Sequence, residues 1–197
     1  SGSFGSAMYL RGGDLIEVRN NLVYKNLGGA KAIDIDNPLA VDIYFTNNTV
    51  YDNEGRVWIE LEGSSNMLVA NNVIRENEGF SDLSVLGSGN WYSYNNNIGN
   101  THSIPNTSIN NINLPARFAD PNNLDFSPSV TSPIIDQGFL PCAYTSLLCI
   151  FPVPFTHDWE LVTKDLFGND RILNNKVEMG AVEVSYESDV IFMDLFE

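Results

Sequence analysis

Two pairs of carboxylates have a spacing that could support acid–base chemistry. Asp34 and Asp36 lie in the segment AIDID, and Glu60 and Glu62 lie in WIELEG. Residues two apart on an extended strand point to the same side and stand roughly 7 Å apart. Two carboxyl groups at that separation suit an inverting glycoside hydrolase, or a shared cation such as calcium.

The residues around these carboxylates favour a simpler role. Each acid alternates with isoleucine or leucine, which is typical of a strand with one buried and one solvent-facing side. Acids on the solvent-facing side keep a surface soluble without taking part in chemistry. The pectin-hydrolase signatures N-T-D, D-D, G-H-G and R-I-K are absent. His102 and His157 are isolated, and neither lies in a Ser or Cys arrangement that suggests a nucleophile. We therefore expect no catalytic centre and no cofactor, and the four carboxylates are the candidates if a centre exists.

Trp58 is the aromatic side chain best suited to stack against a sugar ring. In RVWIEL it alternates with apolar neighbours, so the strand pattern places it on the outer side. Trp91 occupies a position that the same pattern predicts to face inward. Trp58 is therefore the candidate sugar platform.

The strands that position these residues belong to a repeat. The phrases RNNLVYKN, TNNTVYDN, ANNVIREN and YNNNIGNT recur along the first half of the chain. Their first asparagines are 27, 24 and 24 residues apart: Asn20, Asn47, Asn71 and Asn95. A period in this range is typical of a stacked solenoid.

Apolar residues stay in register with each asparagine phrase, two and four positions before it and three after. This alternation describes a short strand that ends at a bend, where asparagine tolerates left-handed backbone angles. A unit of 24 residues cannot bury its apolar face alone, so identical units must stack. We predict an all-β, right-handed parallel β-helix with a ladder of amides through Asn20, Asn47, Asn71 and Asn95. A leucine-rich horseshoe and a β-sandwich are minor alternatives.

The register fails after Ile98, where prolines and polar residues dominate. We expect coils over residues 1–103, a cap over 104–184 that runs across the end of the solenoid, and a tail over 185–197. An insertion at 139–164 carries both cysteines, Cys142 and Cys149. A local disulfide in an oxidising compartment is the favoured use of this pair, and two free thiols are the alternative.

Two later stretches resemble a known family. DPNNLDFSPSVTSPIIDQG (120–138) and DLFGNDRILNNKVEMGAVE (165–183) are similar to the C-terminal region of bacterial choice-of-anchor Q proteins. Pro128 and Glu178 depart from that family's pattern, and the insertion is not part of it. The resemblance implies a β-helix on a secreted or surface-bound bacterial protein. The motif positions Asp136, Arg171, Gly180 and Glu183 are then cap residues, and Asp136 is expected to accept hydrogen bonds from the backbone or from Arg171.

The bulk composition excludes several partners. A net charge of −15 with only ten Lys and Arg residues argues against nucleic acid. No apolar run approaches the roughly 20 residues needed to span a membrane. We expect a structural or adhesive protein that contacts extracellular polysaccharide or a host or cell surface. The alternative is a polysaccharide lyase or glycoside hydrolase. The first coil should pair with upstream coils or with a neighbouring chain.

Overall fold

The computed structural model describes residues 5–37, 42–63, 65–140 and 162–185. Cys142, Cys149 and nearly all of the predicted tail lie outside the described residues. The disulfide therefore stays a prediction.

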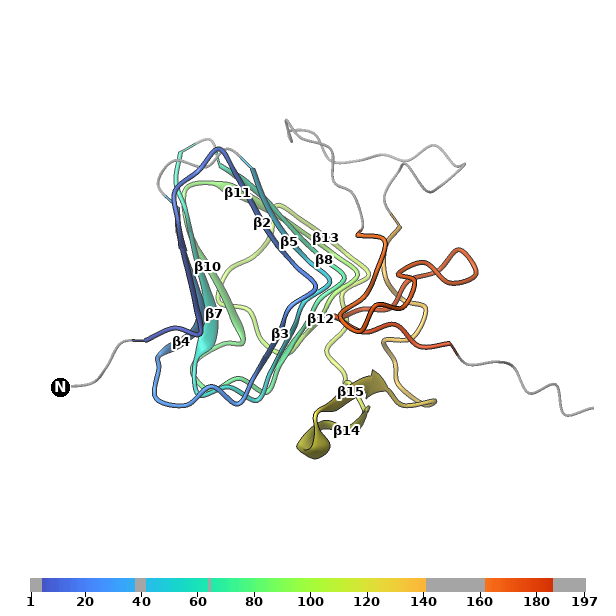
Figure 1. Ribbon diagram of the computed structural model, residues 1–197. Helices are drawn as coiled ribbons and strands as arrows, with labels where there is room; N and C mark the ends of the chain where they lie inside the picture. Colours follow the sequence, from blue (N-terminus) through green and yellow to red (C-terminus); the bar gives the residue numbers. More distant parts are fainter. Residues whose placement is uncertain (1–4, 38–41, 64, 141–161, 186–197) are drawn as a thin grey trace, which may run out of the picture.

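Three parallel sheets form a tube that is triangular in cross-section (Figure 1). Sheet A contains β1 (Met8–Arg11), β4 (Lys31–Asn37), β7 (Arg56–Leu61) and β10 (Leu83–Gly87). Sheet B contains β2 (Leu15–Arg19), β5 (Asp42–Thr46), β8 (Asn66–Ala70), β11 (Asn90–Tyr94) and β13 (Thr107–Ile109). Sheet C contains β3 (Leu22–Tyr24), β6 (Thr49–Tyr51), β9 (Val73–Arg75) and β12 (Asn97–Ile98). The predicted all-β parallel β-helix is confirmed.

The interior of the tube consists of columns of apolar side chains. In sheet B, Ile16 pairs with Ile43, Ile43 with Met67, and Met67 with Trp91. All four side chains are buried. Stacked coils thus bury the apolar face that a single coil would leave in water. The inward direction predicted for Trp91 is confirmed.

The asparagine corners form as predicted, but the ladder runs through the other residue of each pair. Asn20, Asn47, Asn71 and Asn95 adopt the left-handed conformation, with φ of 59°, 54°, 58° and 48°. The amide ladder joins the asparagines that follow them, with Nδ2–Oδ1 distances of 2.9, 3.1, 2.9 and 3.0 Å along Asn21, Asn48, Asn72, Asn96 and Asn111. The predicted ladder was therefore wrong by one residue.

A second ladder, which we did not predict, stands five residues further along each coil. Asn26 donates to Asn53 and Asn53 to Asn77, both at 2.8 Å. Asn77 donates its backbone N–H to Asp82 at 2.8 Å. Burial raises the pKa of the Asp82 carboxyl above its ordinary value. A carboxylate accepts without donating, so Asp82 ends this ladder.

A shorter fifth coil extends the tube beyond residue 103, the predicted end of the coils. The interval between ladder asparagines falls from 24 residues to 15 between Asn96 and Asn111. Thr101 bridges to Leu83 in sheet A, and Asn106 already donates to Trp91 of sheet B at 2.8 Å. In this coil the chain therefore passes sheet A with one bridging residue instead of a strand, and continues directly into sheet B.

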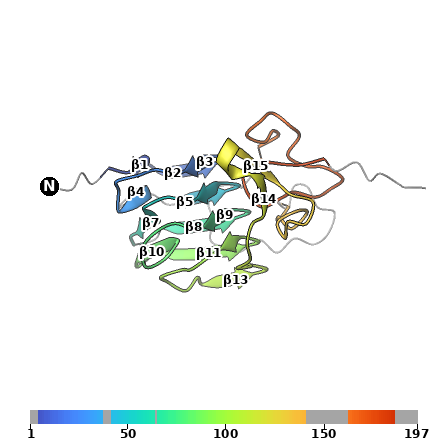
Figure 2. The same ribbon diagram turned by 90° about the horizontal axis from the view of Figure 1, so that it is seen from below.

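Residues 114–140 and 162–185, named here the cover, lie along the side of the tube (Figures 1 and 2). Their regular structure is the hairpin of β14 (Phe118–Asp120) and β15 (Asp125–Pro128), with a 3-10 turn at Pro121–Asn123 between its strands. The expectation that this region runs across the end of the solenoid is therefore wrong. In this lateral position the cover shields the apolar outer sides of sheets B and C, which would otherwise be exposed to water.

At three corners, the first asparagine forms hydrogen bonds with the backbone of the cover. Asn20 donates to the carbonyl of Lys164 at 2.6 Å, and Asn95 donates to that of Gln137 at 2.7 Å. Asn71 both accepts from and donates to the backbone of Phe139, at 2.5 and 2.9 Å. The corner asparagines therefore connect the tube to the cover, while their neighbours connect one coil to the next.

Candidate functional site

Sheet A is the sheet whose outer face the cover leaves open. The outer side of sheet B is buried where Tyr44, Leu68 and Tyr94 pack against Phe139, Leu140 and Ile172 of the cover. On sheet C, Val73 packs against Ala116, Ile134 and Met179. Figure 1 places β4, β7 and β10 on the opposite side of the tube from the cover. A ligand that binds along the tube would meet sheet A.

The outer face of sheet A carries the candidate residues in two columns. Tyr9 pairs with Asp34 and Asp34 with Trp58, while Arg11 pairs with Asp36 and Asp36 with Glu60. The intervening residues, among them Ile33, Ile35 and Ile59, are buried. The outward direction predicted for Asp34, Asp36, Glu60 and Trp58 is therefore confirmed. Glu62 lies just beyond the end of β7 and is exposed.

Two of the four candidate carboxylates pair with cations instead of with each other. Lys31 Nζ lies 2.9 Å from Asp34, and Arg11 Nε lies 3.4 Å from Asp36. The Tyr9 hydroxyl also donates to Asp36, at 3.3 Å. Asp36 faces Glu60 on the next coil, where two like charges repel each other unless a cation compensates them. Arg11 supplies that cation.

Trp58 lies beneath two cations. Lys31 Nζ is 4.7 Å and the Arg56 guanidinium 4.5 Å from the centre of its ring. Cations at this distance are attracted by the ring quadrupole, so they hold the half-buried indole in place. The aromatic platform predicted at Trp58 is thus a composite of one ring and two charged groups.

These residues form a strip whose charges balance. We name the sheet A strip by its members: Tyr9, Arg11, Lys31, Asp34, Asp36, Arg56, Trp58 and Glu60. It has three cations and three carboxylates, although the whole chain carries −15 and only ten Lys and Arg residues. We did not predict Arg11 and Lys31 as site residues. Superimposing the outward positions of successive coils would have found Arg11, which lies one coil away from Asp36. Lys31 lies in the same strand as Asp34, three residues before it.

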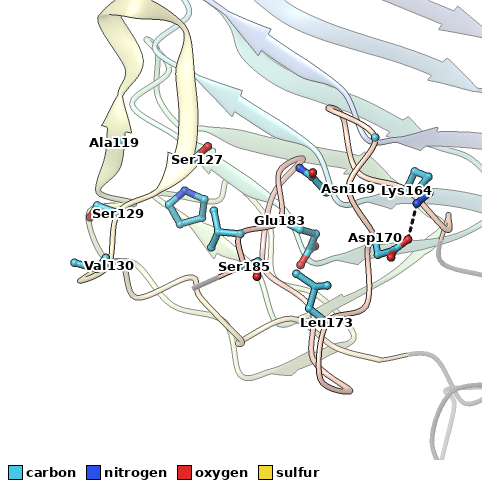
Figure 3. Close-up of a pocket in the computed structure, with 13 residues that line it drawn as sticks. Ala119, Ser127, Ser129, Val130, Lys164, Asn169, Asp170, Leu173, Glu183 and Ser185 are labelled. Carbon is cyan, nitrogen blue, oxygen red and sulfur yellow. Dashed lines mark hydrogen bonds and ion pairs between the residues drawn. The ribbon is translucent and has the colours of Figure 1, made fainter. Parts of the chain in front are cut away.

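A hollow of about 870 Å³ lies within the cover (Figure 3). The β14–β15 side contributes Ser127, Ser129 and Val130, and the opposite side contributes Asn169 and Leu173. Lys164 and Asp170, also on that side, pair with each other at 2.6 Å. The hollow therefore offers hydroxyl and amide groups together with a charge pair that is already neutralised. It could hold a small polar molecule.

The predicted cap residues form a buried ionic centre, with a change of partner. Arg171 Nη1 lies 2.5 Å from Glu183, and both side chains are fully buried. Arg171 also donates to the carbonyls of Gly180 and Ala181, each at 3.0 Å, and to the side chain of Asn20. The expectation that Asp136 accepts from the backbone or from Arg171 is wrong. Asp136 instead pairs at 2.8 Å with Lys176 on the surface.

Acids outnumber bases around Arg171. Burial lowers the pKa of Arg171 to about 10, so the guanidinium stays charged at neutral pH. Asp165, Glu178 and Glu183 are all buried nearby. Burial raises the pKa of Glu178 to about 7, and the charge of Asp136 adds to this effect. Asp165 accepts from the backbone of Phe167, Asn169 and Glu183, which makes its loop a tight turn.

The raised pKa of Glu178 makes the stability of the fold depend on pH. The unfolded chain loses this proton near pH 4.5, so the folded state binds more protons between that pH and about 7. The free energy of unfolding should therefore fall as the pH rises through this interval, by up to about 3 kcal/mol. Urea unfolding of the Glu178→Gln variant should show a flatter profile and greater stability at pH 8. The exposed substitution Glu60→Gln should keep the original slope, and an unchanged slope in Glu178→Gln would contradict the assignment.

The described part of the chain contains no helix of the length and apolar composition that a membrane crossing requires. In the same residues, no three His, Cys, Asp or Glu side chains are grouped to hold a metal ion. No family model, curated protein or solved structure matches the chain.

Proposed function

We propose that the chain is a non-catalytic binding solenoid of a secreted or surface-bound bacterial protein, and that the sheet A strip contacts extracellular polysaccharide. The observation that carries this proposal is the contrast between the three faces. The outer faces of sheets B and C pack against the cover, whereas sheet A presents an aromatic ring, three cations and three carboxylates. The exported location rests on the resemblance of residues 120–138 and 165–183 to choice-of-anchor Q proteins.

The chemistry of the strip favours an uncharged polymer. Its carboxylates can accept hydrogen bonds from sugar hydroxyls, and its guanidinium groups can donate to ring and hydroxyl oxygens. Parallel strands repeat these groups about every 4.8 Å along the tube, which suits an extended chain. The overall charge of −15 would repel a uronate polymer at low ionic strength.

Titration of neutral and uronate polysaccharides tests the proposal. We expect neutral polymers to bind the chain, and we expect Trp58→Ala to weaken that binding at least tenfold, since buried aromatic anchors carry most of the energy of an interface. Phe167→Ala is the matched control, because Phe167 is 58% exposed and lies on the cover. It should bind like the unmodified chain. Failure of every neutral polymer to bind, or equal loss in both variants, would refute the proposal.

One observation favours the enzymatic alternative, a polysaccharide lyase or glycoside hydrolase. Asp36 and Glu60 face each other on neighbouring coils, with Arg11 beside Asp36. Close carboxylates are the arrangement that retaining glycoside hydrolases use. Release of reducing ends, or of unsaturated uronates, from the same polymers would establish this activity, and its loss in Glu60→Gln would locate it. Because cations already neutralise Asp34 and Asp36, we propose binding without turnover.

A further inference from the structure

The two asparagine ladders have a direction. In every internal coil, the ladder Oδ1 accepts two hydrogen bonds from the coil before it. Asn48 Oδ1 accepts from the backbone N–H and the Nδ2 of Asn21, and Asn53 Oδ1 accepts from the same two groups of Asn26. Each Nδ2 also donates to a carbonyl of the preceding coil, as Asn48 does to Val18. Each amide-to-amide bond therefore runs from an Nδ2 to the Oδ1 of the following coil, so every ladder Oδ1 points toward the N-terminal end.

The chain closes both ladders at the C-terminal end. Asn111 donates to Ser108 Oγ at 2.9 Å and to the Ser93 carbonyl at 3.0 Å, so its amide needs no further coil. Asp82 ends the second ladder and accepts from the backbone of Asn100 with its other oxygen, at 3.0 Å. The shortened fifth coil lies over the same end.

Both ladders are open at the N-terminal end. Asn21 Oδ1 and Asn26 Oδ1 accept no hydrogen bond from any described residue, although their counterparts Asn48 and Asn53 each accept two. The strands β1, β2 and β3 are the edges of their sheets. The core is slightly less covered here, because Ile16 and Val23 are 8% and 7% exposed while the next coil's Ile43 and Val50 are 0% exposed.

We propose that the N-terminal end of the tube binds a further parallel β-coil that carries two asparagines five residues apart. Asn21 and Asn26 have this spacing, as do Asn48 and Asn53, and Asn72 and Asn77. Such a coil supplies an amide and a backbone N–H to each open acceptor. Its carbonyls three residues earlier accept from Asn21 and Asn26, as those of Val18 and Val23 accept from Asn48 and Asn53.

A second copy of the same chain does not fit this end. Two N-terminal ends brought together would oppose acceptors with acceptors, because both copies present Oδ1 atoms there. The C-terminal end of a second copy offers no free ladder donor, because Ser108 and Ser93 occupy the amide of Asn111 and Asp82 is an acceptor. The polarity of the ladders therefore selects a coil of the internal type. This inference is independent of the proposed polysaccharide function.

An added coil tests the inference in the full chain. Residues 66–81, placed directly before Ala7 in place of residues 1–6, continue the register, because Leu83 and Met8 occupy equivalent positions of sheet A. This segment leaves out Asp82, which would close the second ladder. The added asparagines then precede Asn21 and Asn26 by one coil of 24 residues, the spacing found between internal coils. We expect the melting temperature to rise by at least 5 °C relative to the unmodified chain. The same addition with its two ladder asparagines changed to aspartate keeps the length but loses the amide donors, and it should give no such rise.

Equal melting temperatures for the two additions would overturn the proposal, as would a lower value for the asparagine form. Sedimentation of the unmodified chain at increasing concentration provides the second measurement. We expect a monomer at all concentrations, because like ends do not complement each other. A dimer that the added coil abolishes would identify a second copy as the partner and would also overturn the proposal.

Discussion

Replacing Asn72 by glycine is expected to lower the free energy of unfolding by about 3–5 kcal/mol, because five buried groups lose a hydrogen-bond partner. The Asn72 side chain accepts from the backbone N–H and the Nδ2 of Asn48. It donates to the carbonyls of Phe45 and Ala70 and to Oδ1 of Asn96. Chemical denaturation followed by circular dichroism would measure the loss.

Asn47→Gly is the matched control, since the same substitution is then made at a corner instead of within a ladder. Asn47 has a positive φ of 54°, which glycine adopts without strain. Its Nδ2 has no hydrogen-bond partner among the described residues. We expect a change within about 1 kcal/mol. A similar loss of unfolding free energy in both variants would show that a ladder asparagine contributes no more to stability than a corner asparagine.

Replacing Arg171 by methionine is expected to destabilise the fold by about 3–5 kcal/mol, because it leaves Glu183 buried without its cation. The change also removes the hydrogen bonds to Gly180 and Ala181 within the cover, and the bond to Asn20 that joins the cover to the first coil. Limited proteolysis should then cleave the cover before it cleaves the tube. The double variant Arg171→Met, Glu183→Gln should be more stable than Arg171→Met alone, since no unpaired charge remains at residue 183.

The surface pair provides the control for this prediction. Lys176 and Asp136 lie 2.8 Å apart, but their side chains are 55% and 40% exposed. Exposed ion pairs contribute between zero and about 1 kcal/mol. Lys176→Met and Asp136→Asn should therefore leave the melting temperature nearly unchanged. A large loss in Asp136→Asn would restore the central role that the sequence motif suggested for this residue.

The tube was predictable because its signals are local and repeated. Apolar residues recur in register with each asparagine pair, so four coils carry the same evidence for one strand pattern. The displacement of the ladder from Asn71 to Asn72 was not predictable in this way. Alternation assumes an extended backbone, whereas the left-handed corner turns the side chain of the first asparagine outward and that of the second inward.

The position of the cover depends on contacts between distant parts of the chain. Asn20 bonds to Lys164, which is 144 residues away, and no periodicity connects the two. Whether Arg171 pairs with Asp136 or with Glu183 likewise depends on how distant parts of the chain pack. Both acids occupy motif positions, and only the packing of the cover buries one and exposes the other. The sheet A strip was half predictable, because its acids and Trp58 follow the strand pattern. Arg11 meets Asp36, and Lys31 meets Trp58, only through the stacking of neighbouring coils.

The attachment of the cover at three corners limits how the tube can vary in length. Solenoids commonly gain or lose units, because each unit contacts only its neighbours. Here Asn20, Asn71 and Asn95 belong to different coils, and each is bonded to a defined point of one of the two described segments of the cover. Duplication of an inner coil would move these points apart by about 4.8 Å, beyond the reach of a hydrogen bond. The cover therefore fixes the number of coils between the first and the fourth, so that growth of the solenoid is confined to its N-terminal end.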